Sequence, residues 1–139
     1  MQAVKALRDA TLDALKLAAK QACAAAYAPY SRYPVGAALL CEDGRTFSAC
    51  NVENASYGLC ICAERAAMFQ AIAHGARTLT AIAIYTPTRA AATPCGACRQ
   101  VLSEFAHDAT VICCCDDAAA ERRFELSALL PSPFGPECL

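Results

Sequence analysis

Two short cysteine-containing segments of this sequence combine residue types that suit chemistry. The first is Cys62-Ala63-Glu64-Arg65, in which a carboxylate follows a thiol by two residues. The second, further along the chain, is Pro94-Cys95-Gly96-Ala97-Cys98. Three thiolates can bind one metal ion and leave a fourth position for water. A carboxylate held beside that water can carry protons, so the two segments together suggest a catalytic metal site.

The three candidate ligands, Cys62, Cys95 and Cys98, all fall where helices are predicted to begin. Unpaired backbone N–H groups and the positive end of the helix dipole lie there, and both favour thiolate over thiol. Three thiolates on Zn²⁺ leave a local charge of about −1, which weakens the acidification of bound water. Arg65 and Gln100 are close enough in sequence to donate hydrogen bonds to the sulfurs and offset that charge.

The same residues admit other interpretations. Cys60, two residues before Cys62, can complete a structural zinc site with four thiolates. Cys95 and Cys98 alone match a thioredoxin-like redox pair, although this leaves Cys62 and Glu64 without a role. A glutamate in the first turn of a helix is usually only a complement to the dipole.

Composition favours a folded globular protein of one domain, residues 1–139. Hydrophobic residues make up 57% of the chain and charged residues 18%, which indicates a packed core rather than disorder. A chain of this length can bury about two-thirds of its unfolded surface. The net charge of −1 argues against a nucleic acid polymer as partner, because a polyanion requires a basic face.

Targeting signals and cysteine usage favour a cytoplasmic protein without a membrane span. No apolar run reaches the length of about 18 residues that a transmembrane helix needs, and residues 1–10 lack the apolar segment of a secretory signal. Eleven cysteines suggest a secreted disulfide scaffold, but the expected absence of a leader disfavours it. We therefore expect mostly reduced, buried thiols, although no physical reason is evident for the run Cys113-Cys114-Cys115.

Hydrophobic periodicity and turn residues predict alternating helices and strands. Helices are expected over about 3–26, 62–74 and 95–106, with one helical turn over 127–130. Strands are expected over 35–41, 45–52, 79–85, 110–115 and 123–126, the first two joined by a hairpin turn at Asp43-Gly44. His74 and His107, at helix ends, are interpreted as complements to the dipoles. The order predicts an α/β fold, a three-layer α/β/α sandwich with a mixed five-stranded sheet.

The two cysteine segments resemble the signature of the zinc-dependent cytidine deaminase superfamily, a His- or Cys-led x-Glu followed by Pro-Cys-x-x-Cys. The resemblance covers about residues 27–137 and points to the short, homotetrameric cytidine deaminases. The segments that carry it follow the order of the family: Tyr30 to Ala38, Asn51 to Ala55, Pro94 to Gln100, Leu129 to Pro131, and Phe134 to Glu137.

This resemblance implies hydrolytic deamination of free cytidine and 2′-deoxycytidine to uridine and 2′-deoxyuridine, as a step of pyrimidine salvage. It implies one Zn²⁺ per chain, bound by Cys62, Cys95 and Cys98. Glu64 would take a proton from the metal-bound water, protonate the pyrimidine ring nitrogen and pass a proton to the leaving ammonia. The physics agrees, because zinc brings the pKa of water toward neutrality and one nearby carboxylate can shuttle protons.

The resemblance also implies contacts with the nucleoside. Asn51 and Glu53 correspond to a ribose-binding pair, and their spacing places both side chains on one face of a strand end. Taken alone, the two residues would be interpreted as merely closing a strand. Tyr33 and Ala63 correspond to positions beside the base. Tyr33 departs from the family, which usually has phenylalanine there, and its hydroxyl needs a polar partner.

Three further residues correspond to positions that complete the site of a neighbouring subunit. Phe134 matches an aromatic residue that stacks on the base in the neighbour's pocket, and Ala55 and Tyr57 match positions near the sugar. The resemblance therefore implies a homotetramer with shared active sites and an inactive monomer. Without it, Phe134 would be interpreted as a tail residue packed on the core.

Two alternatives to a nucleoside deaminase of this kind stay open. The same chemistry can act on a free base or on a blasticidin-type antibiotic nucleoside, although Asn51 and Glu53 would have no ribose to bind in a base. A non-catalytic, zinc-stabilised binding module would bind the metal without turnover. Polynucleotide editing is disfavoured by the near-neutral charge and by the short segment 86–93, in which only Arg89 is basic.

Overall fold

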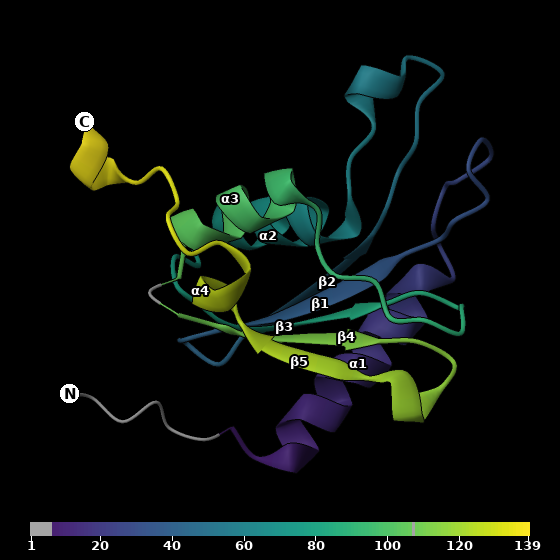
Figure 1. The fold of residues 1–139 in the computed structure, drawn as a ribbon, viewed down its shortest axis with the longest axis horizontal. Helices are drawn as coiled ribbons and strands as arrows, with labels where there is room; N and C mark the ends of the chain where they lie inside the picture. Colours follow the sequence, from purple (N-terminus) through teal and green to yellow (C-terminus); the bar gives the residue numbers. More distant parts are fainter. Residues whose placement is uncertain (1–6, 107) are drawn as a thin grey trace.

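The computed structural model describes residues 7–106 and 108–139, and in it five strands form one mixed sheet between two helical layers (Figure 1). The strands are β1 (Gly36–Cys41), β2 (Thr46–Cys50), β3 (Leu79–Tyr85), β4 (Thr110–Cys114) and β5 (Arg122–Glu125). The helices are α1 (Asp9–Cys23), α2 (Ala63–Ala73), α3 (Gly96–Glu104) and the short α4 (Leu126–Leu129). The predicted three-layer α/β arrangement is confirmed.

The sheet has the order β2-β1-β3-β4-β5, and β3 and β4 form its parallel pair. The other neighbours are antiparallel. The β1–β2 turn contains Gly44 at φ +87°, a left-handed conformation that glycine adopts without a steric cost. Parallel strands need a crossover connection, and the chain from β3 to β4 supplies it through α3. The segment that leads into α3, and with it the second cysteine pair, therefore lies on this crossover.

Apolar side chains cover both faces of the sheet and hold the helices against it. Met68 of α2 and Leu102 of α3 are fully buried on one face. Leu15 and Ala19 of α1 are buried on the other face. A Cβ atom at Gly36 would overlap the carbonyl oxygen of Ala19, so the backbones of β1 and α1 approach too closely for any side chain there.

The first helix is shorter than predicted. It begins at Asp9 and ends at Cys23, whereas the sequence predicted about residues 3–26. Residues 24–26 instead donate backbone hydrogen bonds to carbonyls three residues earlier, which is the tighter winding common at helix ends. Residues 3–6 of the predicted helix and His107 lie outside the described residues.

Between strand β2 and helix α2 the chain leaves the body of the molecule as a projecting segment, residues 53–61 (Figure 1). The sequence predicted no helix or strand between the strand that ends at 52 and the helix that begins at 62, and the segment contains one turn of 3₁₀ helix, Tyr57–Leu59. Its base is closed by isolated bridges that Val52 forms with Tyr27 and Ile61. Within residues 7–106 and 108–139, no helix combines the length and apolar character needed to cross a membrane.

Candidate active site

Three cysteine thiols converge where α2 and α3 begin. Cys62 is the N-cap residue of α2, Cys95 is the N-cap residue of α3, and Cys98 lies in the first turn of α3. Their Sγ atoms all lie within 4.8 Å of one another, and those of Cys62 and Cys95 are 3.8 Å apart. Three sulfurs on one tetrahedral zinc ion are about 3.8 Å apart. The three thiols therefore fit Zn²⁺ in both chemistry and spacing.

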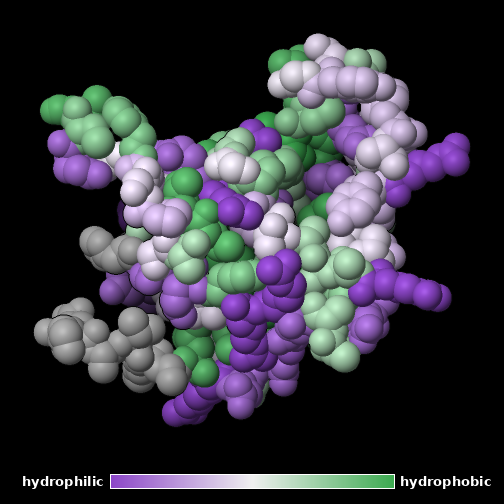
Figure 2. Space-filling model, viewed as in Figure 1, coloured by the Kyte–Doolittle hydropathy of each residue, from purple (hydrophilic) through white to green (hydrophobic). Residues whose placement is uncertain are grey.

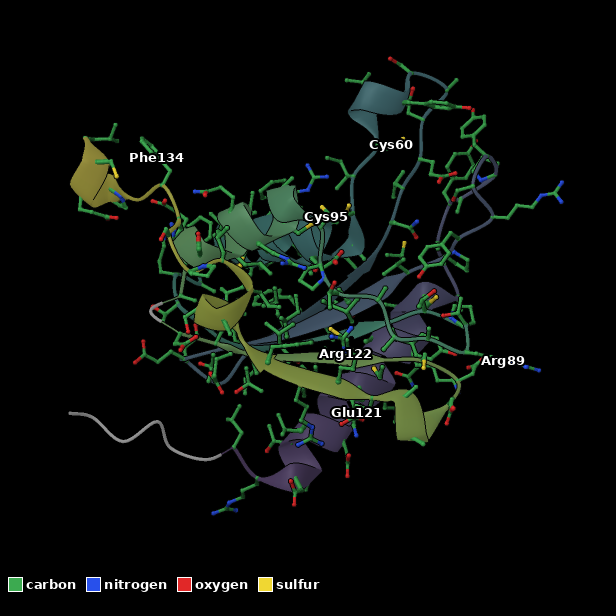
Figure 3. The ribbon with its side chains drawn as sticks, viewed as in Figure 1. Cys60, Arg89, Cys95, Glu121, Arg122 and Phe134 are labelled. Carbon is green, nitrogen blue, oxygen red and sulfur yellow. The ribbon has the colours of Figure 1, made fainter. Side chains whose placement is uncertain are left out.

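Cys60 does not join this cluster. It lies on the projecting segment and away from Cys95 (Figure 3). Its Sγ accepts a hydrogen bond of 3.3 Å from the backbone N–H of Asn54. Among the described residues, the only group of histidine, cysteine or acidic side chains close enough to share a metal ion is the set of three cysteines. The geometry therefore favours three thiol ligands over a four-cysteine structural site.

Arg65 provides the positive charge beside the thiols that the sequence predicted. Its Nη2 donates to Cys62 Sγ at 3.5 Å. Hydrogen bonds from Cys98, Arg65 and Cys95 lower the pKa of Cys62 to about 5, whereas the hydrogen bond to Cys62 and burial raise the pKa of Cys98. The buried Nε of Arg65 has no hydrogen-bond partner among the described residues. A cation here offsets the negative charge that three thiolates bring to one zinc ion.

Glu64 is buried in the first turn of α2 and has a carboxyl group suited to proton transfer. Its side chain is only 5% exposed, and it lines a cleft together with Cys62 and Cys95. Burial, with a further contribution from the negative charge of Cys62, raises the pKa of Glu64 to about 7. A carboxyl group with a pKa near neutrality can both accept and release a proton at physiological pH.

The cleft beside the thiols has a volume of about 410 Å³, within the range of about 300–1,000 Å³ that is usual for small-molecule sites. Besides Glu64 and two of the cysteines, it is lined by four residues to which the family resemblance assigned contacts with the substrate: Tyr33, Asn51, Glu53 and Ala63. The fold thus brings residues from five separate stretches of the chain to one opening.

Asn51 and Glu53 are both held in place by backbone groups. Asn51 Oδ1 accepts from the N–H of Val35 at 2.8 Å, and Asn51 Nδ2 donates to the carbonyl of Tyr33 at 2.9 Å. Glu53 Oε1 accepts from the N–H groups of residues 30 and 31 at 3.0 and 3.1 Å. The second oxygen of Glu53 and the second N–H of Asn51 keep hydrogen-bonding capacity. Both side chains are thus oriented and still able to bind a hydroxyl group.

Ala55, Tyr57 and Phe134 do not line this cleft in their own chain. Tyr57 is 72% exposed on the projecting segment, and its ring packs beside that of Tyr30 at a centroid distance of 5.7 Å. Phe134 is 62% exposed on the C-terminal segment, away from Cys95 (Figure 3). Tyr57 lines a neighbouring pocket with Ser31 and Glu53, two residues that also border the cleft, whereas Phe134 lines a separate pocket.

Two residues that follow Cys98 lie differently from what the sequence suggested. Gln100 was expected to donate to the sulfurs, but its Nε2 donates to the carbonyl of Phe134 at 2.7 Å. Sequence reasoning assigned no role to Arg99, whose guanidinium binds the turn that carries Cys95. The only signal for Arg99 in the sequence is that a cationic residue directly follows the candidate ligand Cys98. The direction in which the Arg99 side chain points depends on the folded C-terminal segment, which includes Leu129.

Comparisons with known proteins agree with this geometry. A family model described as the cytidine and deoxycytidylate deaminase zinc-binding region matches residues 10–115. The cytidine deaminase of Sporosarcina psychrophila is 42% identical over 130 residues, which cover 92% of this chain and 96% of the relative. The crystal structure of cytidine deaminase from Burkholderia pseudomallei superposes with a TM-score of 0.83 at 48% identity, covering 88% of this chain and 98% of that one. The chain belongs to the cytidine and deoxycytidylate deaminase family.

Proposed function

We propose that this protein catalyses the zinc-dependent hydrolytic deamination of free cytidine and 2′-deoxycytidine to uridine and 2′-deoxyuridine, with release of ammonia. The observation that carries the proposal is the convergence of three thiols and one buried carboxyl group at a single cleft. Relatives such as the cytidine deaminase of Sporosarcina psychrophila support the choice of substrate. A reaction of this kind serves pyrimidine salvage.

The proposed mechanism assigns the metal to the cysteines and proton transfer to Glu64. Cys62, Cys95 and Cys98 would hold the zinc ion, which when bound would lower the pKa of a water able to attack the ring carbon bearing the amino group. Glu64 takes one proton from the attacking water and moves it to the pyrimidine ring nitrogen. It then transfers the second proton to the leaving amine, so that ammonia departs and the carbonyl forms. Because Glu64 is buried, bulk water has little access to its carboxylate, and the protons pass between Glu64 and the substrate.

Asn51 and Glu53 are proposed to bind the ribose, and Tyr33 and Ala63 to border the base. The free carboxylate oxygen of Glu53 can accept from a sugar hydroxyl, and the amide of Asn51 can donate to one. Because the backbone already fixes both side chains, little ordering is needed when the nucleoside binds. These contacts favour a nucleoside over a free base.

A substrate panel tests the proposed activity. The purified protein is expected to contain about one zinc per chain and to deplete the ultraviolet band of cytidine and 2′-deoxycytidine. Cytosine is expected to react far more slowly, because it has no sugar for Asn51 and Glu53, and blasticidin S is included to detect an antibiotic deaminase. Bound zinc without turnover of any cytosine compound would instead support a non-catalytic binding module.

We further propose a cytoplasmic homotetramer in which neighbouring subunits complete each cleft. Large apolar side chains are exposed on the projecting segment, at Tyr57 and Leu59, and on the C-terminal segment, at Phe134. The C-terminal segment carries hydrophobic surface (Figure 2). Such surfaces favour contact with another protein chain. All eleven cysteines are free, which suits a reducing compartment.

Substitution of Phe134 tests the shared site. Phe134→Ala is expected to raise the Michaelis constant for cytidine about tenfold, because a stacking contact with the base is lost. The matched control is Leu139→Ala, which removes another exposed apolar side chain from the same segment and is expected to leave the constant unchanged. An unchanged Michaelis constant in Phe134→Ala would count against a stacking role.

A further inference from the structure

The guanidinium of Arg99 joins the turn before α3 to the end of α4. Its Nε donates to the carbonyl of Pro94 at 2.7 Å, and its Nη2 donates to Thr93 Oγ1 at 3.2 Å. Its Nη1 reaches the carbonyl of Leu129 at 2.9 Å. We propose that Arg99 is a positioning residue that fixes Cys95, and with it one wall of the substrate cleft. This inference rests on the proposed zinc site.

Cys95 needs external support more than the other two thiols. Cys98 is fully buried within α3, and Cys62 receives a hydrogen bond from Arg65. Cys95 is exposed and caps α3 from a segment without regular structure. Among the described residues, every hydrogen bond formed by residues 91–94 comes from Arg99. The chain immediately before Cys95 therefore depends on this one side chain for its polar contacts.

The same contacts position the cleft. Thr93 and Cys95 both line it, and Arg99 lies behind them. The third contact, to the carbonyl of Leu129, anchors the turn to the last residue of α4. Arginine suits this task because its planar fork can donate in several fixed directions, whereas the single ammonium of lysine cannot reproduce that geometry. Arg99 thus acts through Cys95 and Thr93 rather than by touching the substrate.

Zinc release from the intact, metal-loaded protein tests the proposal. Arg99→Met is expected to release zinc to a chromophoric chelator about 10-fold faster than the wild type, the lower end of the effect on metal affinity of removing a direct partner of a ligand, because Arg99 acts on Cys95 through the preceding residues. In the cobalt-substituted protein, the thiolate-to-cobalt absorption is expected to shift, because the Cys95 sulfur relaxes. Arg99→Lys should resemble Arg99→Met, and Thr93→Val, which removes one contact, should show a smaller change in the same direction.

Arg77 offers a matched control, because it also donates to backbone carbonyls at a helix end, those of Ile72 and Ala76. Arg77→Met is expected to release zinc at the wild-type rate. A wild-type rate of zinc release together with an unshifted cobalt spectrum in Arg99→Met would overturn the inference. Wild-type behaviour of Arg99→Lys would also overturn it, because it would indicate that the positive charge alone is required. A wild-type protein that binds no zinc would refute the proposed zinc site and this inference with it, whereas a zinc-loaded protein that deaminates no nucleoside would refute only the proposed function.

Discussion

Two groups of three cysteines occur in this protein, and they differ in surroundings rather than in chemistry. Cys62, Cys95 and Cys98 lie at the starts of two helices, where partners lower the pKa of Cys62 to about 5. The run Cys113-Cys114-Cys115 begins within β4. Cys113 is 0% exposed there, and burial raises its pKa to about 12.

The contrast shows how the fold decides the role of a thiol. Hydrogen bonds from the neighbouring thiols and from the guanidinium of Arg65 stabilise negative sulfur at Cys62. Strand β4 offers apolar neighbours instead, and Cys114 Sγ donates to the carbonyl of Ile84 at 3.2 Å. The first group is thus suited to hold a metal, and Cys113 and Cys114 serve as small buried hydrophobes.

The largest expected effect comes from removing one thiol of each group. Cys95→Ala is expected to lose zinc and to lower cytidine turnover by about 10³-fold or more, because the metal supplies the activated water. Cys113→Ala is expected to keep about one zinc per chain and most of its turnover. Metal analysis measures the bound zinc of both variants, and the loss of cytidine absorbance measures their turnover. Loss of zinc from the Cys113→Ala variant would contradict the assignment of Cys113 to packing.

An intermediate effect is expected for thiol labelling after a chelator has removed zinc. Cys95 is exposed and Cys62 is half-buried, so a maleimide should label them about 100-fold faster than Cys113. Cys113 is buried and becomes accessible to the reagent only when the protein unfolds locally. Peptide mass spectrometry over time assigns the rate to each residue, with the exposed Cys138 as an internal reference. Equal labelling rates at Cys95 and Cys113 would contradict the assigned environments.

The smallest effect concerns stability without metal. Cys113→Ala should lower the free energy of unfolding by about 1 kcal/mol, because it leaves a small cavity in a packed core. Cys95→Ala should cost less, since its side chain is exposed. Urea denaturation in the presence of a chelator measures both values, and a larger loss for Cys95→Ala would reverse the expected order.

Much of the fold could be predicted from the sequence because its signals are local. The Asp43-Gly44 turn and the apolar runs of the strands identified the sheet. The end of α1 could not be predicted, because residues 24–26 are alanines that favour helix. Tertiary pairing prevails there: the N–H of Tyr27 donates to the carbonyl of Asn51 at 3.1 Å, which draws the chain toward the sheet.

The candidate site likewise has features that the sequence predicted and features that it did not. The cysteine spacing predicted the three converging thiols, and the position of Arg65 one turn after Cys62 predicted its contact. The sequence left a role for Cys60 open, since only the path of the projecting segment carries it away from the cluster. The directions of Arg99 and Gln100 depend on the folded C-terminal segment, which no local pattern specifies.

The most direct test of the account is the variant Glu64→Gln, measured for bound zinc and for cytidine turnover. The three cysteines hold the metal without Glu64, so the variant is expected to keep about one zinc per chain. Turnover should fall by about 10⁴-fold, the upper range for loss of a general acid–base group, because the amide cannot carry protons. A zinc-loaded Glu64→Gln variant that deaminates cytidine at close to the wild-type rate would contradict the account.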